Sequence, residues 1–382
     1  MDVPEFEDII KQIKTNFWLI GIPFDQRGIK RRYFILIITI IITVIQESAY
    51  FVSNISAENF LELTQLAPCT CIGWLSILKI IFITFKKQNI FDLTRCLKEL
   101  YDEMLSDSKK RKIVRSDFVF LKCLVKYFFI MNIIPVSIYN FSTLVFILYH
   151  YNMHSELVYS LPYAVLCPFT TDVWYSWLFE YLHSITSGFI CVLYFTTVDA
   201  LYYTLTFHIC NQFTLLNNEL QYLDKKSSHC LGEIVIKHQY ILRLSEELEE
   251  IYQAINLFNV LIGSFEICAL GFNLTMGQWS QIPGVLLLLL SILIQMFMNS
   301  AFGDNLIRES RKVGDAAFLC QWYDMDKMAK KFIFLLILRS NKPQKLTAYK
   351  FSAISYQSFT KTISRSWSYF TILRTLYIQP DQ

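Results

Sequence analysis

The sequence predicts an all-α membrane protein with seven transmembrane helices, a cytoplasmic amino terminus, an extracellular carboxy terminus and cytoplasmic helical extensions. Hydrophobic residues make up 54% of its 382 residues. Three long stretches, 33–78, 127–224 and 244–307, contain no lysine or arginine. Each holds two apolar runs of the roughly 20 residues that a membrane-spanning helix needs. Because Lys and Arg stay in cytoplasmic loops, each stretch is predicted to be a hairpin that passes outward and back.

The first four spans fall within residues 33–206, and two more within 254–302. We place the six at 33–52, 62–84, 124–149, 174–206, 254–277 and 283–302. Residues 1–32 form a charged cytoplasmic segment without a cleavable signal sequence, so the first span itself is expected to direct insertion. Asn54-Ile55-Ser56 is a candidate glycosylation site on the predicted outer side. The long outer loop over 150–173 is expected to cover the mouth of a cavity.

Two cytoplasmic segments show helical periodicity. In 207–253, one apolar stripe recurs at spacings of three and four, formed by Ile241, Leu244, Leu248 and Ile251. This indicates an amphipathic helix that runs on into the fifth span, and its partner helix belongs either to the same chain or to a neighbouring subunit.

Within 303–350, residues 326–339 form a second amphipathic stretch that is too short to cross the bilayer. Its predicted apolar face consists of Met328, Phe332, Leu335 and Leu338. The basic cluster Lys109-Lys110-Arg111-Lys112 is expected to face the anionic lipids of the inner leaflet.

The last segment, 351–377, is the most polar of the predicted spans, and only the tail 378–382 follows it. A helix here aligns six residues on one face: Ser358, Lys361, Arg365, Ser368, Ile372 and Leu376. Packed around an axis by several copies, this stripe predicts a water-filled path with an apolar gate at Ile372 and Leu376. The alternative is a core helix whose polar groups bond to neighbouring helices.

Other function classes lack support in the sequence. The ten scattered cysteines suggest no disulfide framework, and no convergent catalytic or metal-binding residues predict an enzyme or a cofactor. The small net charge of +3 does not favour nucleic-acid binding. A carrier would show internal repeats, and a metabotropic seven-helix receptor would have the opposite sidedness.

The carboxy-terminal residues resemble the signature of insect odorant receptors. The resemblance rests on Lys342-Pro343, Leu346-Thr347-Ala348, Phe351, Phe359, Arg365, Ser368-Tyr369-Phe370 and Leu373-Arg374. One departure is Tyr349, where that family often has glycine. The insect gustatory receptors, which share the fold, are the alternative, but their ending differs from Ser368-Tyr369 and Leu376-Tyr377.

The resemblance implies a subunit of a ligand-gated, non-selective cation channel. The subunit would bind a volatile small-molecule odorant, form a heterotetramer with the shared odorant co-receptor, and reside in the dendritic membrane of olfactory neurons. Its pore helix would carry the gate at Ile372 and Leu376, with Thr375 as a polar pore residue. The segments at 207–253 and 326–339 would form a subunit anchor that includes Ile241, Leu244, Leu248, Ile251, Phe332 and Leu335.

The same resemblance places an odorant pocket in the outer half of spans two to six. Candidate lining residues are Leu66 and Cys69 in the second span, Tyr139, Ser142 and Phe146 in the third, and Phe179, His183 and Thr186 in the fourth. Two acids, Glu180 and Glu266, fall within predicted spans, where an ionisable residue commonly has a structural or functional partner. His183 is expected to pair with Glu180, three residues earlier.

Overall fold

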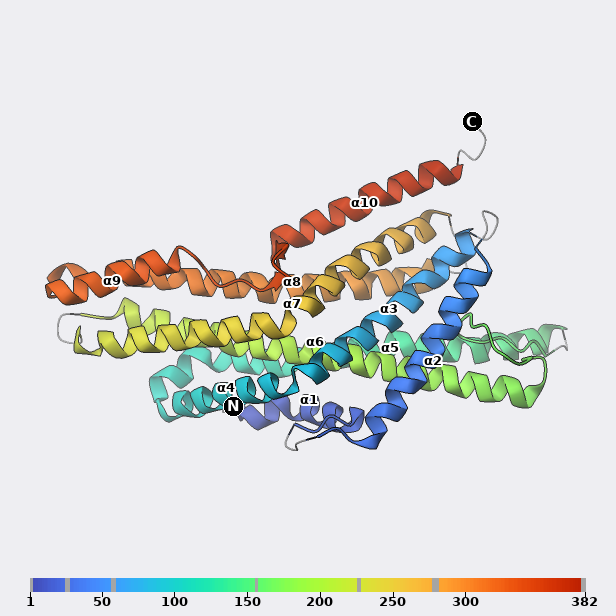
Figure 1. Cartoon of the computed structure of the whole chain (residues 1–382), viewed down its shortest axis with the longest axis horizontal. Coiled ribbons are helices and arrows are strands. Elements are labelled where there is room, and N and C mark those ends of the chain that lie inside the picture. Colours follow the sequence, from blue (N-terminus) through green and yellow to red (C-terminus); the bar gives the residue numbers. More distant parts are fainter. Residues whose placement is uncertain are drawn as a thin grey trace.

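The computed structural model describes residues 3–24, 28–55, 60–154, 157–224, 228–276 and 282–378, most of them helical (Figure 1). In chain order the α-helices are α1 Phe6–Ile20, α2 Arg31–Ser53, α3 Phe60–Phe85, α4 Lys87–Ser106, α5 Ser108–His154, α6 Trp174–Gln221, α7 Leu231–Met276, α8 Ile282–Leu319, α9 Lys327–Ser340 and α10 Tyr356–Ile378. Two short 3-10 turns, Ser228–Cys230 and Trp322–Asp324, and the two-residue strands β1 Thr347–Ala348 and β2 Ser352–Ala353 complete the described elements.

Six helices, α2, α3, α5, α6, α7 and α8, are long and apolar enough to cross a membrane. They coincide with the six spans predicted from the apolar runs, which confirms those helices. The last helix, α10, is too polar to be counted among them and belongs to a separate, carboxy-terminal helical region.

Four of the six apolar helices are much longer than a bilayer requires. The longest, α6, has 48 residues, so it extends for about 72 Å at 1.5 Å per residue, against a hydrocarbon core of about 30 Å. The predicted continuity of the 207–253 segment with the fifth span is confirmed, since α7 runs unbroken from Leu231 to Met276. The helix α6 also continues past residue 206, the predicted end of the fourth span, to Gln221.

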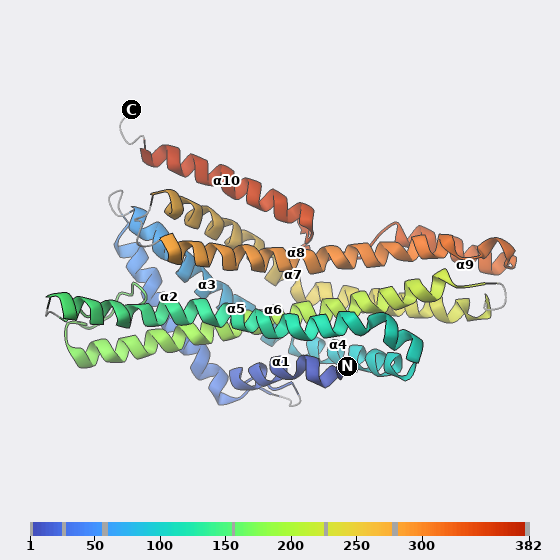
Figure 2. The ribbon, with the colours of Figure 1, turned by 180° about the vertical axis from the view of Figure 1, so that it is seen from behind.

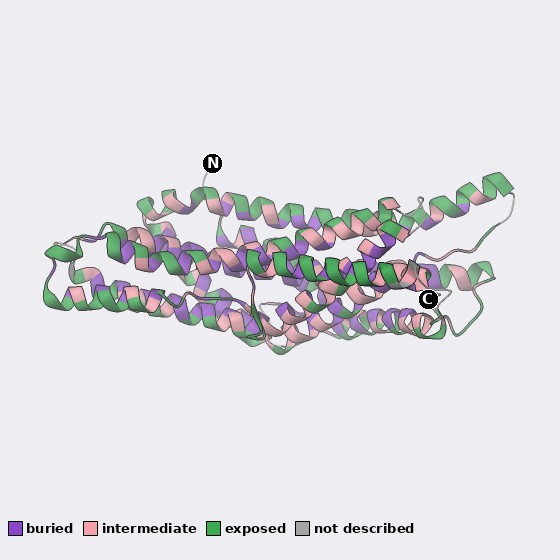
Figure 3. Cartoon of the chain, turned by 90° about the horizontal axis from the view of Figure 1, so that it is seen from above, coloured by how far each residue is buried: buried purple, intermediate pink, exposed green. Residues whose placement is uncertain are grey.

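The centre of the bundle is α6, which packs against α1, α2, α3, α5, α7 and α8. Every residue from Thr196 to Thr206 is buried. Polar side chains are tolerated there because hydroxyls such as those of Thr196 and Thr204 donate to the carbonyl four residues earlier. Buried residues line the facing sides of the helices and exposed residues cover the outside (Figure 3).

The outermost helix is α10, which contacts α7 and α8 and stands at the edge of the bundle (Figures 1 and 2). It begins at Tyr356 rather than at residue 351, because residues 352–353 pair with 347–348 as an antiparallel β hairpin. Tyr349, where the sequence departs from the family pattern, lies in the turn of this hairpin. Both Tyr349 and Lys350 have positive φ, 50° and 65°, a conformation that glycine adopts at no steric cost. Tyr349 is held in this turn by its N–H, which donates to the Gln253 carbonyl at 3.1 Å.

Candidate functional site

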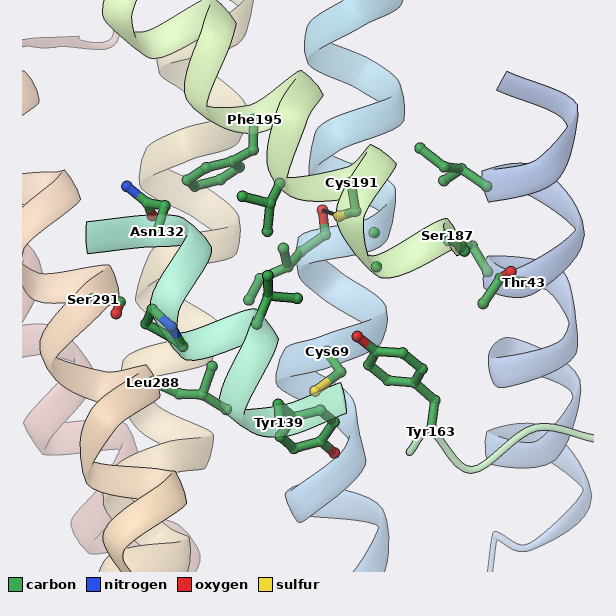
Figure 4. A pocket seen from close by; sticks show the side chains of 18 of the residues that line it. Thr43, Cys69, Asn132, Tyr139, Tyr163, Ser187, Cys191, Phe195, Leu288 and Ser291 are labelled. Carbon is green, nitrogen blue, oxygen red and sulfur yellow. Dashed lines mark hydrogen bonds between the residues drawn. The ribbon is translucent and has the colours of Figure 1, made fainter. Parts of the chain in front are cut away.

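A largely apolar cavity lies among the spanning helices (Figure 4). Its volume of about 130 Å³ is roughly ten times the space that one water molecule needs, so it has room for a small organic molecule. Its wall is formed by Ile40, Thr43, Val44 and Glu47 of α2; Cys69, Ile72 and Gly73 of α3; Asn132, Pro135, Val136 and Tyr139 of α5; Tyr163 of the following loop; Ser187, Gly188, Cys191, Val192 and Phe195 of α6; and Leu288, Ser291, Ile292 and Gln295 of α8.

The loop between α5 and α6 closes one side of the cavity through Tyr163. Its hydroxyl donates to Oδ1 of Asn140 at 2.9 Å, and its ring lies 5.4 Å from the ring of Tyr139. Gly188 makes this position possible, because a Cβ atom there would lie only 2.5 Å from the Tyr163 hydroxyl oxygen. Tyr163 is therefore part of the wall. The hydrogen bond to Asn140 holds it there, and Gly188 leaves room for its hydroxyl group.

A buried ion pair lies next to the cavity at Phe195 and Gln295. The Lys79 ammonium contacts both carboxylate oxygens of Asp199, at 2.8 and 2.9 Å, and lies 3.7 Å from the centre of the Phe195 ring. Gln295 donates to the same carboxylate at 2.8 Å. The arrangement joins α3, α6 and α8, with every charge compensated in an environment where an unpaired charge would be costly.

Sequence reasoning missed this ion pair, although a signal was present. Lys79 falls inside the predicted span 62–84, and Asp199 inside 174–206. An ionisable residue within a span is unusual enough to call for a partner of opposite charge.

The polar stripe of α10 lies on the exposed face of that helix. Lys361, Arg365, Ser368, Ile372 and Thr375 are all exposed within the single chain. The opposite face packs on α7, where Phe370 joins Cys268 and Phe272 in an apolar cluster and Ser366 donates to the Ser264 carbonyl at 2.9 Å. Leu376 belongs to α10, but its side chain lies outside the part of the structure that is described.

Comparison with known proteins identifies the chain. The family described as 7tm Odorant receptor matches residues 59–366. This chain belongs to the odorant receptor family. It is 26% identical over 347 residues to Putative odorant receptor 92a of Drosophila melanogaster, covering 87% of this chain and 84% of the relative. It is 32% identical over 248 residues to Odorant receptor 13a of the same insect, covering 58% and 59%.

The fold of the receptor is also that of a solved insect receptor. The structure of the olfactory receptor OR5 from Machilis hrabei in complex with eugenol superimposes with a TM-score of 0.80 at 15% sequence identity, covering 96% of this chain and 97% of the other. The receptor is thus an insect-type, multi-pass membrane protein that acts in olfaction and is not an enzyme. The odorant family is supported over the gustatory alternative.

Only two of the eight residues predicted to bind ligand line the cavity, Cys69 and Tyr139. The other six lie elsewhere, because the faces predicted for the helices differ from the faces that are buried in the structure. On α6 each predicted residue is followed directly by a buried one, namely Glu180, Ser184 and Ser187. Consequently Phe179 and Thr186 are exposed and His183 is half-buried. On α5, Ser142 and Phe146 are exposed. On α3, Leu66 is half-buried but does not belong to the wall.

The acids predicted within spans are both buried. Nδ1 of His183 lies 3.4 Å from Oε1 of Glu180, as the spacing predicted. Glu266 is 2% exposed, and its Oε1 atom has no hydrogen-bond partner among the described atoms. Neither acid lines the cavity.

The two predicted anchor stripes have different surroundings. Ile241, Leu244, Leu248 and Ile251 are buried inside the receptor's own core, so the partner of that stripe lies within the same chain. On α9 the apolar residues buried in the chain are Ala329, Ile333 and Leu336. The predicted packing face is instead exposed, with Met328, Phe332, Leu335 and Leu338 at 59%, 38%, 47% and 56%.

Asn54 follows the last residue of α2 and donates from Nδ2 to the Tyr50 carbonyl at 2.8 Å. Ser56, which completes its glycosylation sequence, lies outside the described residues.

Proposed function

We propose that this receptor binds a volatile small molecule in the cavity and thereby opens a non-selective cation channel, which it forms with the odorant co-receptor. One observation carries this proposal: α8 contributes both to the cavity wall and to the packing of α10, the helix with the exposed polar stripe.

The connection can be followed from residue to residue. Ile292 lines the cavity and packs with Leu270 and Met296 in an apolar cluster against which Phe359 of α10 is packed. Phe297 follows Met296 on α8, and the centre of its ring lies 5.7 Å from that of Tyr356 and 5.8 Å from that of Phe359. A ligand that displaces Ile292 therefore acts on the start of α10 through direct side-chain contacts, which supplies a physical link between the two sites.

The pore role of α10 is supported by the surroundings that its exposed polar face requires. Lys361 and Arg365 would each cost about 2.5–3.5 kcal/mol at the centre of a lipid bilayer. Facing a shared axis instead, they meet water, and Ile372 and Leu376 form apolar rings near the outer end. Such rings block ions by excluding water until they widen. Thr375 would border the same narrow region.

Assembly with the co-receptor would use the exposed face of α9, including Phe332 and Leu335. Contiguous apolar side chains on a surface outside the membrane mark a site of protein contact. The buried stripe at Ile241 and Leu244 would support this anchor from inside the subunit.

The proposed orientation follows the charge distribution. The amino terminus and the basic cluster at residues 109–112 would lie in the cytoplasm, against anionic lipids, and the carboxy terminus outside. Asn54 would then be available for glycosylation, and the receptor would reside in the dendritic membrane of olfactory neurons. An epitope at the carboxy terminus should be labelled on intact cells; labelling only after permeabilisation would contradict this orientation.

The decisive experiment is co-expression with the co-receptor and recording of current during exposure to a panel of volatiles that includes eugenol. We expect evoked cation current only when both chains are present.

Substitution Phe359→Ala should reduce the current while leaving ligand binding intact, with Phe120→Ala, an exposed phenylalanine of α5, as the control. Robust current from this chain alone would contradict the partnership. Equal effects of the two alanine substitutions would contradict the proposed path.

A further inference from the structure

Glu47 places an acidic side chain in the wall of an otherwise largely apolar cavity. It lies on α2, two turns before the end of that helix, and is 8% exposed. Its Oε2 atom is buried without a hydrogen-bond partner among the described atoms. A buried carboxylate oxygen with no donor is costly, so its presence in a binding cavity calls for an explanation.

Glu47 lines the cavity together with polar groups from several other elements. These are the Cys69 and Cys191 thiols and the Tyr139 and Tyr163 hydroxyls. These four groups belong to α3, α5, the following loop and α6. Among the residues of this wall, Glu47 is the one with an acidic side chain.

No basic side chain among the described residues forms an ion pair with Glu47. Lys79, which lies 3.7 Å from the centre of the Phe195 ring in the cavity wall, already contacts both oxygens of Asp199. The other buried acids differ in position. Glu180 pairs with His183 and, like Glu266, does not line the cavity. Glu47 is therefore the described acid whose missing donor a bound molecule can supply.

We propose that the cavity selects a small apolar molecule that carries a protonated amine, and that the amine donates its N–H to Oε2 of Glu47. This inference rests on the proposed role of the cavity as the ligand site. Ile40, Val44 and Val136 would pack against the hydrocarbon part, and the rings of Tyr139 and Tyr163 offer further contact to a cation. The ammonium ion supplies the counter-charge that the protein lacks, and a charge-assisted hydrogen bond is the strongest polar contact available there.

Three probes of almost equal shape separate this contact from simple cavity filling: cyclohexylmethylamine, cyclohexylmethanol and ethylcyclohexane. Alkylamines are protonated at neutral pH. Binding is measured directly, on the full-length receptor in lipid nanodiscs, by calorimetry. We expect the amine to bind about tenfold or more tightly than ethylcyclohexane, with the alcohol between them, since a hydrogen bond to a charged group exceeds a neutral one.

The variant Glu47→Gln should reduce the advantage of the amine to less than about threefold, while ethylcyclohexane binds as before. Retained binding of the hydrocarbon shows that the variant is folded. The matched control is Glu180→Gln, which removes an equally buried acid outside the cavity and should leave the order of the three probes unchanged.

The proposal is wrong if the amine shows no advantage in the unmodified receptor, if the alcohol binds as tightly as the amine, if none of the probes binds, or if Glu47→Gln leaves the advantage in place. Because binding is measured without current, the outcome is independent of the channel proposal. An amine that binds through Glu47 but evokes no current would contradict the channel function alone. Current evoked by volatiles with no preference for amines would contradict only the role of Glu47.

Discussion

The Nζ atom of Lys79 lies 2.8 Å from Oδ1 of Asp199, and these side chains are 0% and 2% exposed. This contact joins α3 to α6 across 120 residues of sequence, beside the cavity residues Phe195 and Gln295. Because both charges are removed from water, each is tolerated only in the presence of the other.

Substitution Lys79→Met should therefore destabilise the receptor by about 3–5 kcal/mol, since Asp199 would keep a buried charge without a cation. The double variant Lys79→Met with Asp199→Asn should recover much of the loss. The measurement is thermal unfolding of the purified receptor, together with its amount at the cell surface. Lys98→Met is the control, because Lys98 pairs with Glu7 in a partly exposed contact that contributes less than about 1 kcal/mol. Similar losses for Lys79→Met and Lys98→Met would contradict this account.

Substitution Gly188→Ala should displace Tyr163 from the cavity wall. The new Cβ would lie 2.5 Å from the tyrosine hydroxyl, and the hydrogen bond to Asn140 would be lost. We expect the concentration for half-maximal response to change by about tenfold, which corresponds to 1.4 kcal/mol. Adding Tyr163→Phe removes the clashing atom and should restore part of the response. Gly232→Ala is the matched control, since no heavy atom lies within 4 Å of a Cβ at that position. If Gly188→Ala is as silent as Gly232→Ala, the loop does not form this wall in the working receptor.

Substitution Ile372→Ser should raise the basal current or change ion permeation, because a hydroxyl in an apolar ring favours a continuous water column. The measurement is current through the co-expressed channel without ligand and with different permeant cations. Ile35→Ser tests an isoleucine of similar exposure on α2, 63% against 56%, and should leave both properties unchanged. Unaltered conduction in Ile372→Ser would assign the gate to another position.

Substitution Phe332→Glu should weaken assembly without unfolding the subunit, because this side chain is exposed on the single chain and would be buried only against a partner. The expected result is a loss of most co-purification with the co-receptor. Tyr222→Glu introduces the same charge at another exposed aromatic, on the residue after α6, and should not affect assembly. Normal assembly of Phe332→Glu would exclude this face of α9 as an interface.

The apolar runs of the sequence predicted the six long apolar helices, but they did not show which face of every helix is buried. On α7, glutamates opposite the Ile241–Ile251 stripe leave one apolar face, and that face is buried. On α9, Ile333 and Leu336 compete with Phe332 and Leu335, so two apolar faces exist and the pattern does not show which one the chain itself covers.

The faces that line the cavity were harder to predict for a related physical reason. Spanning helices are apolar on most sides, so the pattern does not show which side of a helix another helix covers. On α6 it did not show that Phe179 is exposed and Glu180 is buried. The pairing of Lys79 with Asp199 depends on how α3 and α6 pack. Glu47, near the end of the first predicted span, became a candidate only once the cavity was known.

The continuous length of α6 has a mechanical consequence. A helix of 48 residues that tilts by about 3° around its midpoint moves each end by about 2 Å, taking 1.5 Å of rise per residue. The cavity residues Ser187 to Phe195 lie in the first half of this helix, and the second half continues to Gln221. Because these residues lie within about 16 Å of the midpoint, at 1.5 Å of rise per residue, the same tilt moves them by less than about 1 Å. A displacement of that size at the cavity would thus reach the far end of α6 at larger amplitude, with no hinge needed between them.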